Sequence, residues 1–224
     1  MITVANAGFE DLLAVGTGAD GNYDYATNPP GGYYYTWPLP NWGYIGQDYT
    51  GIFNPKAGMI TGEAPEGQCV GFVEADTRAD PGPLTGGLAQ VLGTDLAPNM
   101  TYTLTVKVGN PKYVDYSTKS NTYPGYRVQL LAGGTVLAED ANTLPVAKDA
   151  WVSSTVLYST GATVTPGQKL EIRLVNMGIS PGGSSQDHYV LYDDVRLDAI
   201  PEPATMGLLA MSGLALLRRR RRVA

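Results

Sequence analysis

The carboxylate best placed to do chemistry in this chain lies in an otherwise apolar row. From residue 189 to residue 197 the sequence alternates with a period of two, the pattern of a half-buried strand. This pattern puts Asp193 on one face with Tyr189, Leu191, Val195 and Leu197. A buried carboxylate without a partner is costly, so Asp193 needs a calcium ion, backbone amides or a cation. The candidate cations are Arg127, Arg173 and Lys169.

The other side chains with reactive chemistry are isolated in the sequence. Cys69 is the single cysteine, so no disulfide can form within the chain, and its apolar neighbours indicate a small buried residue in a strand. His188 is the single histidine, which excludes a metal cluster built from histidines. A Cys-His dyad would therefore require the fold to bring Cys69 and His188 together.

Three pairs of adjacent acidic residues are candidates for the acid and base of a glycosidase. They are Glu10 with Asp11, Glu139 with Asp140, and Asp193 with Asp194. Adjacent residues of a strand point to opposite faces, so no such pair can work as acid and base by itself. The sequence also contains no P-loop or HExxH motif, and neither a GxSxG elbow nor a GxGxxG motif on a strand-turn-helix. We therefore predict a protein that is not an enzyme, with a polysaccharide hydrolase as the least favoured alternative.

Aromatic side chains are concentrated in one segment rich in Gly, Pro and Asn. Seven of the 15 tyrosines lie between residues 23 and 49. Flat rings stack on sugar faces, which makes this segment a candidate glycan-binding platform. The platform comprises Tyr33, Tyr34, Tyr35, Trp37 and Tyr44, and a second aromatic group comprises Tyr113, Tyr116, Tyr123 and Tyr126. The alternative is that these rings fill a small core beneath long loops.

The elements that must position these residues are strands. The clearest alternation runs from Thr101 to Gly109, and Gly133-Gly134 supplies the tight turn of a predicted hairpin. Further strands are expected at residues 126–130, 135–138, 151–158, 169–176 and 188–197, whereas residues 84–96 are ambiguous. With 28 glycines and 16 prolines between them, these segments predict an all-β, antiparallel two-sheet β-sandwich over residues 1–199.

The charge of this domain argues against nucleic acid as a partner. The whole chain has a formal net charge of −6, with 15 basic and 21 acidic residues. Five of the basic residues lie at positions 218–222, and one acidic residue is Glu202. Without these six residues, 10 basic residues face 20 acidic ones, a net charge of −10. Such a domain repels phosphate backbones.

Residues 200–224 have a different composition. The motif Pro201, Glu202 and Pro203 precedes an uncharged stretch of 14 residues, Ala204 to Leu217. As a helix this stretch would be about 21 Å long, which spans a bilayer of roughly 30 Å only marginally. The basic run Arg218, Arg219, Arg220, Arg221 and Arg222 would stay on the cytoplasmic side. We expect a short hydrophobic helix, which either enters the membrane or packs on the domain as an ordinary C-terminal helix.

This order of motif, apolar stretch and basic run resembles the PEP-CTERM sorting signal of Gram-negative bacteria. The resemblance implies recognition by an exosortase-type membrane transpeptidase, which would cut near Pro201-Glu202-Pro203 after the chain has transiently engaged the inner membrane. The domain would then pass to the cell surface or to an extracellular polysaccharide matrix. An exported protein carries a signal peptide, and Met1 to Val4 is not one, so we expect that signal to have been trimmed or to lie upstream of this start.

Four short motifs, in order along the chain, carry a second resemblance. They are Asn6-Ala7-Gly8-Phe9-Glu10, Trp42-Gly43, residues 87–92 leading into Tyr102-Thr103-Leu104, and residues 192–197. Together they look like the galactose-binding-like jelly roll of carbohydrate-binding modules. In those modules the positions of Glu10 and Asp193 help to hold a structural calcium ion, a role that hard carboxylate oxygens suit. The alternative is a hydrogen-bonded Asp193 without metal.

These observations favour an exported, non-catalytic protein of the cell surface or matrix that binds exopolysaccharide or another glycan. The alternative is a structural or adhesive protein that associates with itself through sheet edges or through the tyrosine-rich loops.

Overall fold

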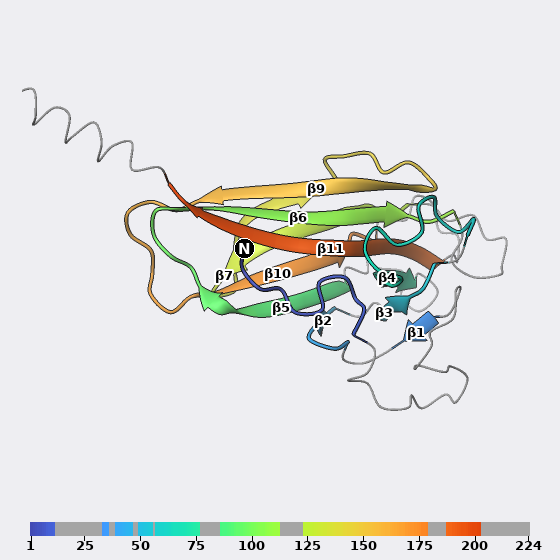
Figure 1. Ribbon diagram of the computed structural model, residues 1–224, viewed down its shortest axis with the longest axis horizontal. Coiled ribbons are helices and arrows are strands. Elements are labelled where there is room, and N and C mark those ends of the chain that lie inside the picture. Colours follow the sequence, from blue (N-terminus) through green and yellow to red (C-terminus); the bar gives the residue numbers. More distant parts are fainter. Residues whose placement is uncertain are drawn as a thin grey trace, which may run out of the picture.

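The molecule is built from two antiparallel sheets packed face to face (Figure 1). The computed structural model describes residues 1–11, 33–35, 39–46, 49–55, 57–76, 86–112, 123–178 and 187–202. All secondary structure in these residues is β, which confirms the predicted all-β, two-sheet antiparallel sandwich.

The first sheet has the strand order β1-β3-β4-β11-β6-β9 and the second has the order β2-β5-β10-β7-β8. The strands of the first sheet are β1 (Tyr33–Tyr35), β3 (Tyr49–Phe53), β4 (Val70–Asp76), β11 (Asp187–Pro201), β6 (Met100–Asn110) and β9 (Ala150–Ser159). Those of the second sheet are β2 (Gly43–Ile45), β5 (Gly86–Asp95), β10 (Lys169–Asn176), β7 (Tyr126–Ala132) and β8 (Thr135–Ala141). Figure 1 shows β11 running along the length of the sandwich between β6 and β4.

The strands predicted from alternation are present. The segment Thr101 to Gly109 lies in β6, and the ambiguous residues 84–96 contain β5. The β7–β8 hairpin turns at Gly133 and Gly134, whose φ angles of 55° and 80° lie in the left-handed region that glycine adopts at little cost.

The core between the sheets is filled by inward-facing side chains of both layers. Examples of fully buried inward-facing side chains are Leu104 on β6, Leu130 on β7 and Ile172 on β10. At the N-terminal side, the Phe9 ring stacks on Trp42 with 5.5 Å between ring centroids. The N-terminal segment is thereby part of the same core.

A second apolar cluster covers the outer face of the first sheet. It contains Met59, Ile60, Val70, Phe72, Tyr189 and Leu191. The segment 57–69, which we name the covering loop, packs there, and Trp151 on β9 donates its indole N–H to the carbonyl of Glu63 at 3.0 Å. Both faces of the strand pair β4–β11 are therefore buried.

A β-bulge in β11 changes which side chains share a face. Asp193 pairs with Lys107 but Arg196 pairs with Thr105, so one extra residue lies between them, and Asp194 adopts a φ of 49°. A bulge reverses the alternation that follows it. Asp193 therefore lies on the outer face, whereas Val195 packs in the inner core. The prediction of one continuous row from residue 189 to residue 197 is wrong for this reason.

The strand β11 ends at Pro201, and the predicted hydrophobic helix and the arginine run fall on residues 203–224, outside the described residues. In the part of the chain that is described, no helix has the length and apolar character needed to cross a membrane.

Candidate functional site

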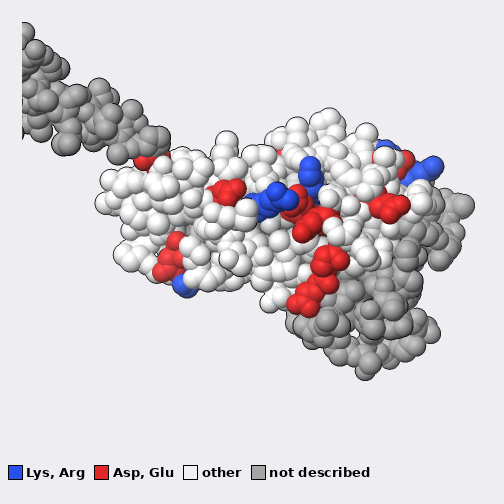
Figure 2. Space-filling view, viewed as in Figure 1, with Lys and Arg blue, Asp and Glu red and all other residues white. Residues whose placement is uncertain are grey.

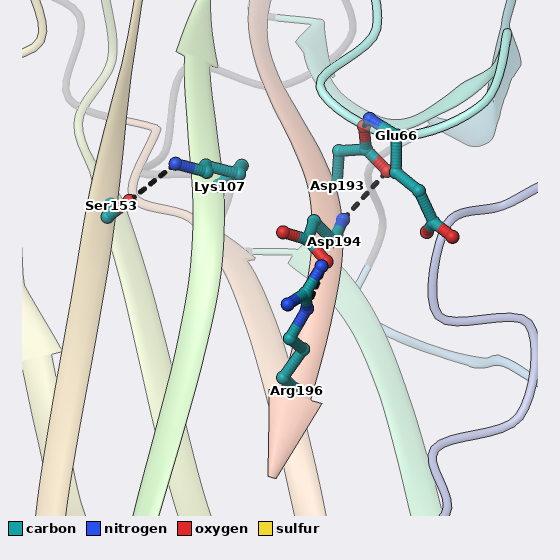
Figure 3. Close-up of polar contacts among 6 residues, drawn as sticks. All are labelled: Glu66, Lys107, Ser153, Asp193, Asp194 and Arg196. Carbon is teal, nitrogen blue, oxygen red and sulfur yellow. Dashed lines mark hydrogen bonds and ion pairs between the residues drawn. The ribbon is translucent and has the colours of Figure 1, made fainter.

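Asp193 is fully buried, and Figure 3 shows its side chain beside Glu66 of the covering loop. Its Oδ2 accepts the backbone N–H of Glu66 at 2.8 Å, and its Oδ1 accepts the N–H of Asp194 at 2.7 Å. Burial raises the pKa of Asp193 to about 8, because desolvation and the negative charges of Glu66 and Asp194 outweigh these two hydrogen bonds. Of the three kinds of partner considered from the sequence, backbone amides are the ones the structure shows.

The cations expected near Asp193 contact other carboxylates. Lys169 Nζ lies 2.7 Å from Asp95, Arg173 Nε lies 2.6 Å from Glu171, and Arg127 Nε lies 3.5 Å from Glu139. Each of these six residues belongs to the second sheet, and Asp193 belongs to the first.

The cross-strand neighbour of Asp193 is also engaged elsewhere. Lys107 pairs with Asp193 in register, but its Nζ donates to Ser153 Oγ at 2.8 Å (Figure 3). Arg196 Nε contacts Asp194 Oδ1 at 2.5 Å. On the face drawn in Figure 2, basic side chains likewise lie beside acidic ones, and most of the described surface is uncharged.

Glu10 and Asp193 secure the same loop. Glu10 Oε1 accepts the backbone N–H groups of Gln68 and Cys69, both at 2.6 Å, two and three residues beyond the amide that Asp193 accepts. Both carboxylates thus have backbone partners without a metal. Among the described residues no group of three or more His, Cys, Asp or Glu is arranged to hold an ion. Calcium at Glu10 and Asp193 stays a prediction.

The predicted glycan platform is described only in part. Tyr33, Tyr34 and Tyr35 form β1 at the edge of the first sheet, and Tyr44 is half-buried in β2 of the other sheet. Trp37 and the side chains of residues 33–35 lie outside the described residues. The platform therefore stays a prediction.

One end of the core is polar, and we name it the inner polar end. Its members lie between the sheets and come from six strands; those on the strands are buried, and Tyr123 is half-buried. They are Asn110 of β6, Tyr126 of β7, Asp140 of β8, Ser154 of β9, Asn176 of β10 and Tyr192 of β11, with Tyr123 just before β7.

Asp140 is the hydrogen-bonding centre of the inner polar end. Its Oδ2 accepts from the hydroxyl groups of Tyr126 at 2.7 Å and Ser154 at 2.6 Å. Its Oδ1 accepts from the backbone N–H of Thr143 at 3.0 Å and from the Thr143 hydroxyl at 2.6 Å. Burial by itself raises the pKa of Asp140, but the bonds from Ser154, Thr143 and Tyr126 outweigh it and hold the pKa below its usual value. Asp140 is therefore ionised at neutral pH.

Two neutral phenols, Tyr126 and Tyr123, lie close to this carboxylate, and a third, Tyr192, lies close to these two. Burial, followed by the hydrogen bond to Asp140, raises the pKa of Tyr126 to about 12. Burial likewise raises the pKa of Tyr123 and of Tyr192, and the Tyr192 hydroxyl donates to the carbonyl of Val175 at 2.7 Å.

Two buried polar atoms of the inner polar end have no hydrogen-bond partner within the described part of the chain. They are the Tyr123 hydroxyl and Asn110 Oδ1. Buried polar groups are otherwise nearly always paired, so such atoms are candidates to meet a ligand. An anion behind aromatic rings can stabilise positive charge, and an unpaired phenol can hydrogen-bond a carbonyl or an imine.

Asp140, the central residue of the inner polar end, was singled out from the sequence but was given no role. Asp140 was one of an adjacent acidic pair whose members were expected on opposite faces, and Glu139 is indeed exposed while Asp140 is buried. Tyr126, predicted as part of the second aromatic group, lies in the main core between the sheets and not in a small core beneath loops. The sequence feature that could have revealed this site is an acidic residue at a strand position whose side chain points toward the core.

Comparison with known proteins divides the chain into two matches. The model of the HpiC1-like family, described as HpiC1 cyclase, matches residues 1–198, and the PEP-CTERM protein-sorting motif matches residues 199–222. The second match confirms the predicted sorting signal, which implies export, processing by an exosortase and sorting to the cell surface. No curated protein matches the chain.

Solved structures of cyclases resemble the domain over nearly its whole length. The Stig cyclase FisC from Fischerella sp. TAU, in complex with (3Z)-3-(1-methyl-2-pyrrolidinylidene)-3H-indole, is 30% identical with a TM-score of 0.69, over 90% of this chain and 98% of that one. An apo cyclase from Fischerella sp. is 30% identical with a TM-score of 0.70, over 90% and 97%. A Fischerella sp. TAU cyclase in complex with 4-(1H-indol-3-yl)butan-2-one is 29% identical with a TM-score of 0.63, over 90% and 98%.

The prediction that this protein is not an enzyme is wrong, because both the family match and these structures point to a cyclase. The motifs whose absence led to that prediction belong to hydrolases, nucleotide-binding enzymes and metalloproteases, so their absence does not bear on cyclases. On the match over residues 1–198, the chain belongs to the HpiC1-like cyclase family.

Proposed function

We propose that this protein is an exported cyclase that closes a ring on an indole-bearing or closely similar aromatic substrate. The observation that carries the proposal is the 30% identity to FisC over 90% of this chain. Two of the similar Fischerella cyclases hold indole derivatives, and these compounds indicate the substrate class.

The inner polar end is the site that suits this chemistry best among the described residues. Attack of an electrophile on an indole ring places positive charge on that ring in the transition state. The ionised Asp140 and the ring of Tyr126 favour positive charge, most strongly where water is excluded. Tyr123 is half-buried, and its unpaired hydroxyl would hydrogen-bond the substrate.

Binding of an indole probe tests the proposal. We expect the purified protein to bind 4-(1H-indol-3-yl)butan-2-one in isothermal titration calorimetry. Loss of one hydrogen bond worth about 1 kcal/mol in Tyr123→Phe should weaken the Kd about fivefold. Tyr158→Phe, which removes the hydroxyl of a half-buried ring on β9, is the matched control. No binding by the wild-type protein would refute the substrate class, and equal binding by both variants would refute the site.

The route to the cell surface is the second part of the proposal. The sorting signal supports passage through the inner membrane of a Gram-negative cell, cleavage near Pro201-Glu202-Pro203, and release of the domain, here taken as residues 1–199, from the tail at residues 200–224. Fractionation of the native host tests this route. A full-length chain that stays in the cytosol with its C-terminus uncut would contradict it.

Glycan binding is a second candidate function, which sorting to the cell surface and the edge position of β1 favour. Tyr34→Ala or Trp37→Ala should abolish binding on a glycan array. Concentration-dependent oligomers without glycan binding would instead support the self-associating protein.

A further inference from the structure

The sorting motif begins within the last strand of the first sheet. The match to the sorting signal starts at residue 199, yet β11 continues to Pro201. Pro201 pairs with Met100 of β6, and the backbone N–H of Glu202 donates to the carbonyl of Asn99 at 2.8 Å. Pro201 is therefore part of the sheet, and Glu202 is hydrogen-bonded to the turn that precedes β6.

The register explains how a proline fits there. Antiparallel pairs alternate between those that exchange backbone hydrogen bonds and those that do not. The hydrogen bond from Glu202 to Asn99 makes the neighbouring Pro201–Met100 pair one that exchanges none. The nitrogen of Pro201 therefore faces away from β6, and its missing N–H removes no bond from the ladder.

The turn that receives the motif is held by its own hydrogen bonds. The N–H groups of Asn99 and Met100 donate to Gly161 O and Thr160 Oγ1, both at 2.9 Å. The Thr160 hydroxyl donates to Ala97 O at 2.8 Å, and the Thr160 N–H donates to Met100 O at 2.9 Å. Thr160 thus fixes the backbone against which Pro201 and Glu202 pair.

The chain between the sheet and the apolar stretch is also very short. Pro203 separates Glu202 from Ala204, where the uncharged stretch begins. Extended chain spans at most about 3.6 Å per residue, so that stretch starts within about 7 Å of Glu202. No spacer is available to carry the motif away from the domain.

We propose that the folded domain withholds the sorting motif, so that the transpeptidase can take Pro201 and Glu202 only after the last β11–β6 pairs open. A processing enzyme binds a target segment that is not paired with the rest of its protein. The segment at Pro201 and Glu202 cannot pair with β6 and lie in the enzyme's binding groove at the same time. In the reaction itself one peptide bond breaks and the acyl group passes to the enzyme nucleophile. It passes then to water or an acceptor amine, while the released tail takes up the proton on its new amino group.

The inference is independent of the cyclase activity, because it concerns only the junction between domain and tail. Strand ends open more often than strand centres, so the pairing slows processing and does not abolish it. Ile200, Pro201 and Glu202 are exposed, which keeps this opening local.

Hydrogen exchange on the purified full-length chain tests the pairing directly. We expect the amide of Glu202 to exchange at least about tenfold more slowly than in an unstructured peptide. Thr160→Ala should remove most of this protection and leave the Leu104 amide in the core unchanged, whereas Thr160→Ser, which keeps the hydroxyl, should preserve it. Exchange of Glu202 at the peptide rate in the wild-type protein would overturn the proposal.

Processing in the native host tests the consequence. A Gly-Ser-Gly-Ser insertion between Ile200 and Pro201 moves the motif off the sheet, and we expect pulse-chase to show processing several-fold faster than in the wild-type protein. The same insertion between Gly133 and Gly134, at the exposed β7–β8 turn, is the control and should leave the rate unchanged. Equal rates in all three proteins would overturn the proposal.

Discussion

Removal of one hydroxyl from the inner polar end is the sharpest test of its energetics. Tyr126 is fully buried, and its hydroxyl donates to the ionised Asp140 at 2.7 Å. Tyr126→Phe deletes this hydrogen bond and keeps the ring in the core. Asp140 retains its donors from Ser154 and Thr143, so it is not left without partners.

The expected cost follows from the charge of the acceptor. Hydrogen bonds to charged groups contribute about 1.5–3 kcal/mol, roughly twice the value for neutral pairs. We therefore expect Tyr126→Phe to lower the free energy of unfolding by about 2 kcal/mol at pH 7. Tyr158→Phe should change it by less than about 0.5 kcal/mol.

The pH dependence has a definite sign. The folded state holds the pKa of Asp140 below its usual value, so this group stabilises the fold above its unfolded pKa of about 3.9. That contribution disappears as the pH falls through the lower, folded pKa. The difference between wild type and Tyr126→Phe should be constant above about pH 5 and shrink below pH 4.

Urea unfolding followed by tryptophan fluorescence measures both quantities. The two Tyr→Phe variants should be compared at pH 7 and pH 3.5. If Tyr126→Phe costs no more than Tyr158→Phe, or if its cost is equal at the two pH values, the assignment of Asp140 as an ionised acceptor is refuted.

Two further predictions concern packing and calcium. A Cβ on Gly71 would lie 2.6 Å from the Phe9 ring, so Gly71→Ala should destabilise the protein by about 1–3 kcal/mol. Gly93→Ala, whose Cβ would meet nothing within 4 Å, should cost far less in the same denaturation assay. If Glu10 and Asp193 hold calcium, the melting temperature should be higher in millimolar calcium than in excess EDTA. Equal melting temperatures would contradict calcium binding.

The fold was predicted well because its signals are local. Alternation over residues 101–109 and the Gly133-Gly134 turn are read from neighbouring residues, and the structure contains β6 and the β7–β8 hairpin there. Val195 was predicted to lie on the same face of β11 as Asp193. This is wrong because the β-bulge at Asp194 adds one residue to the strand and reverses the alternation after it. The pairing register with β6 places that residue, and the sequence of β11 does not reveal it.

The candidate site was predicted less well than the fold. Residues from six strands meet at the inner polar end, and nothing local connects Asp140 with Ser154 or Tyr126. Short enzyme motifs did not indicate a cyclase for a related reason. Short motifs report active sites built from consecutive residues, whereas residues contributed by separate strands leave no fixed spacing.

The amino-acid sequence by itself determined the strand pattern, the acidic character of the domain and the sorting tail, because each depends on composition or on residues close along the chain. Tertiary structure decided which partners Asp193 and Asp140 have, where the alternation of β11 reverses, and that the sorting motif begins within a sheet. These features depend on contacts between distant segments, and such contacts exist only once the strands have paired.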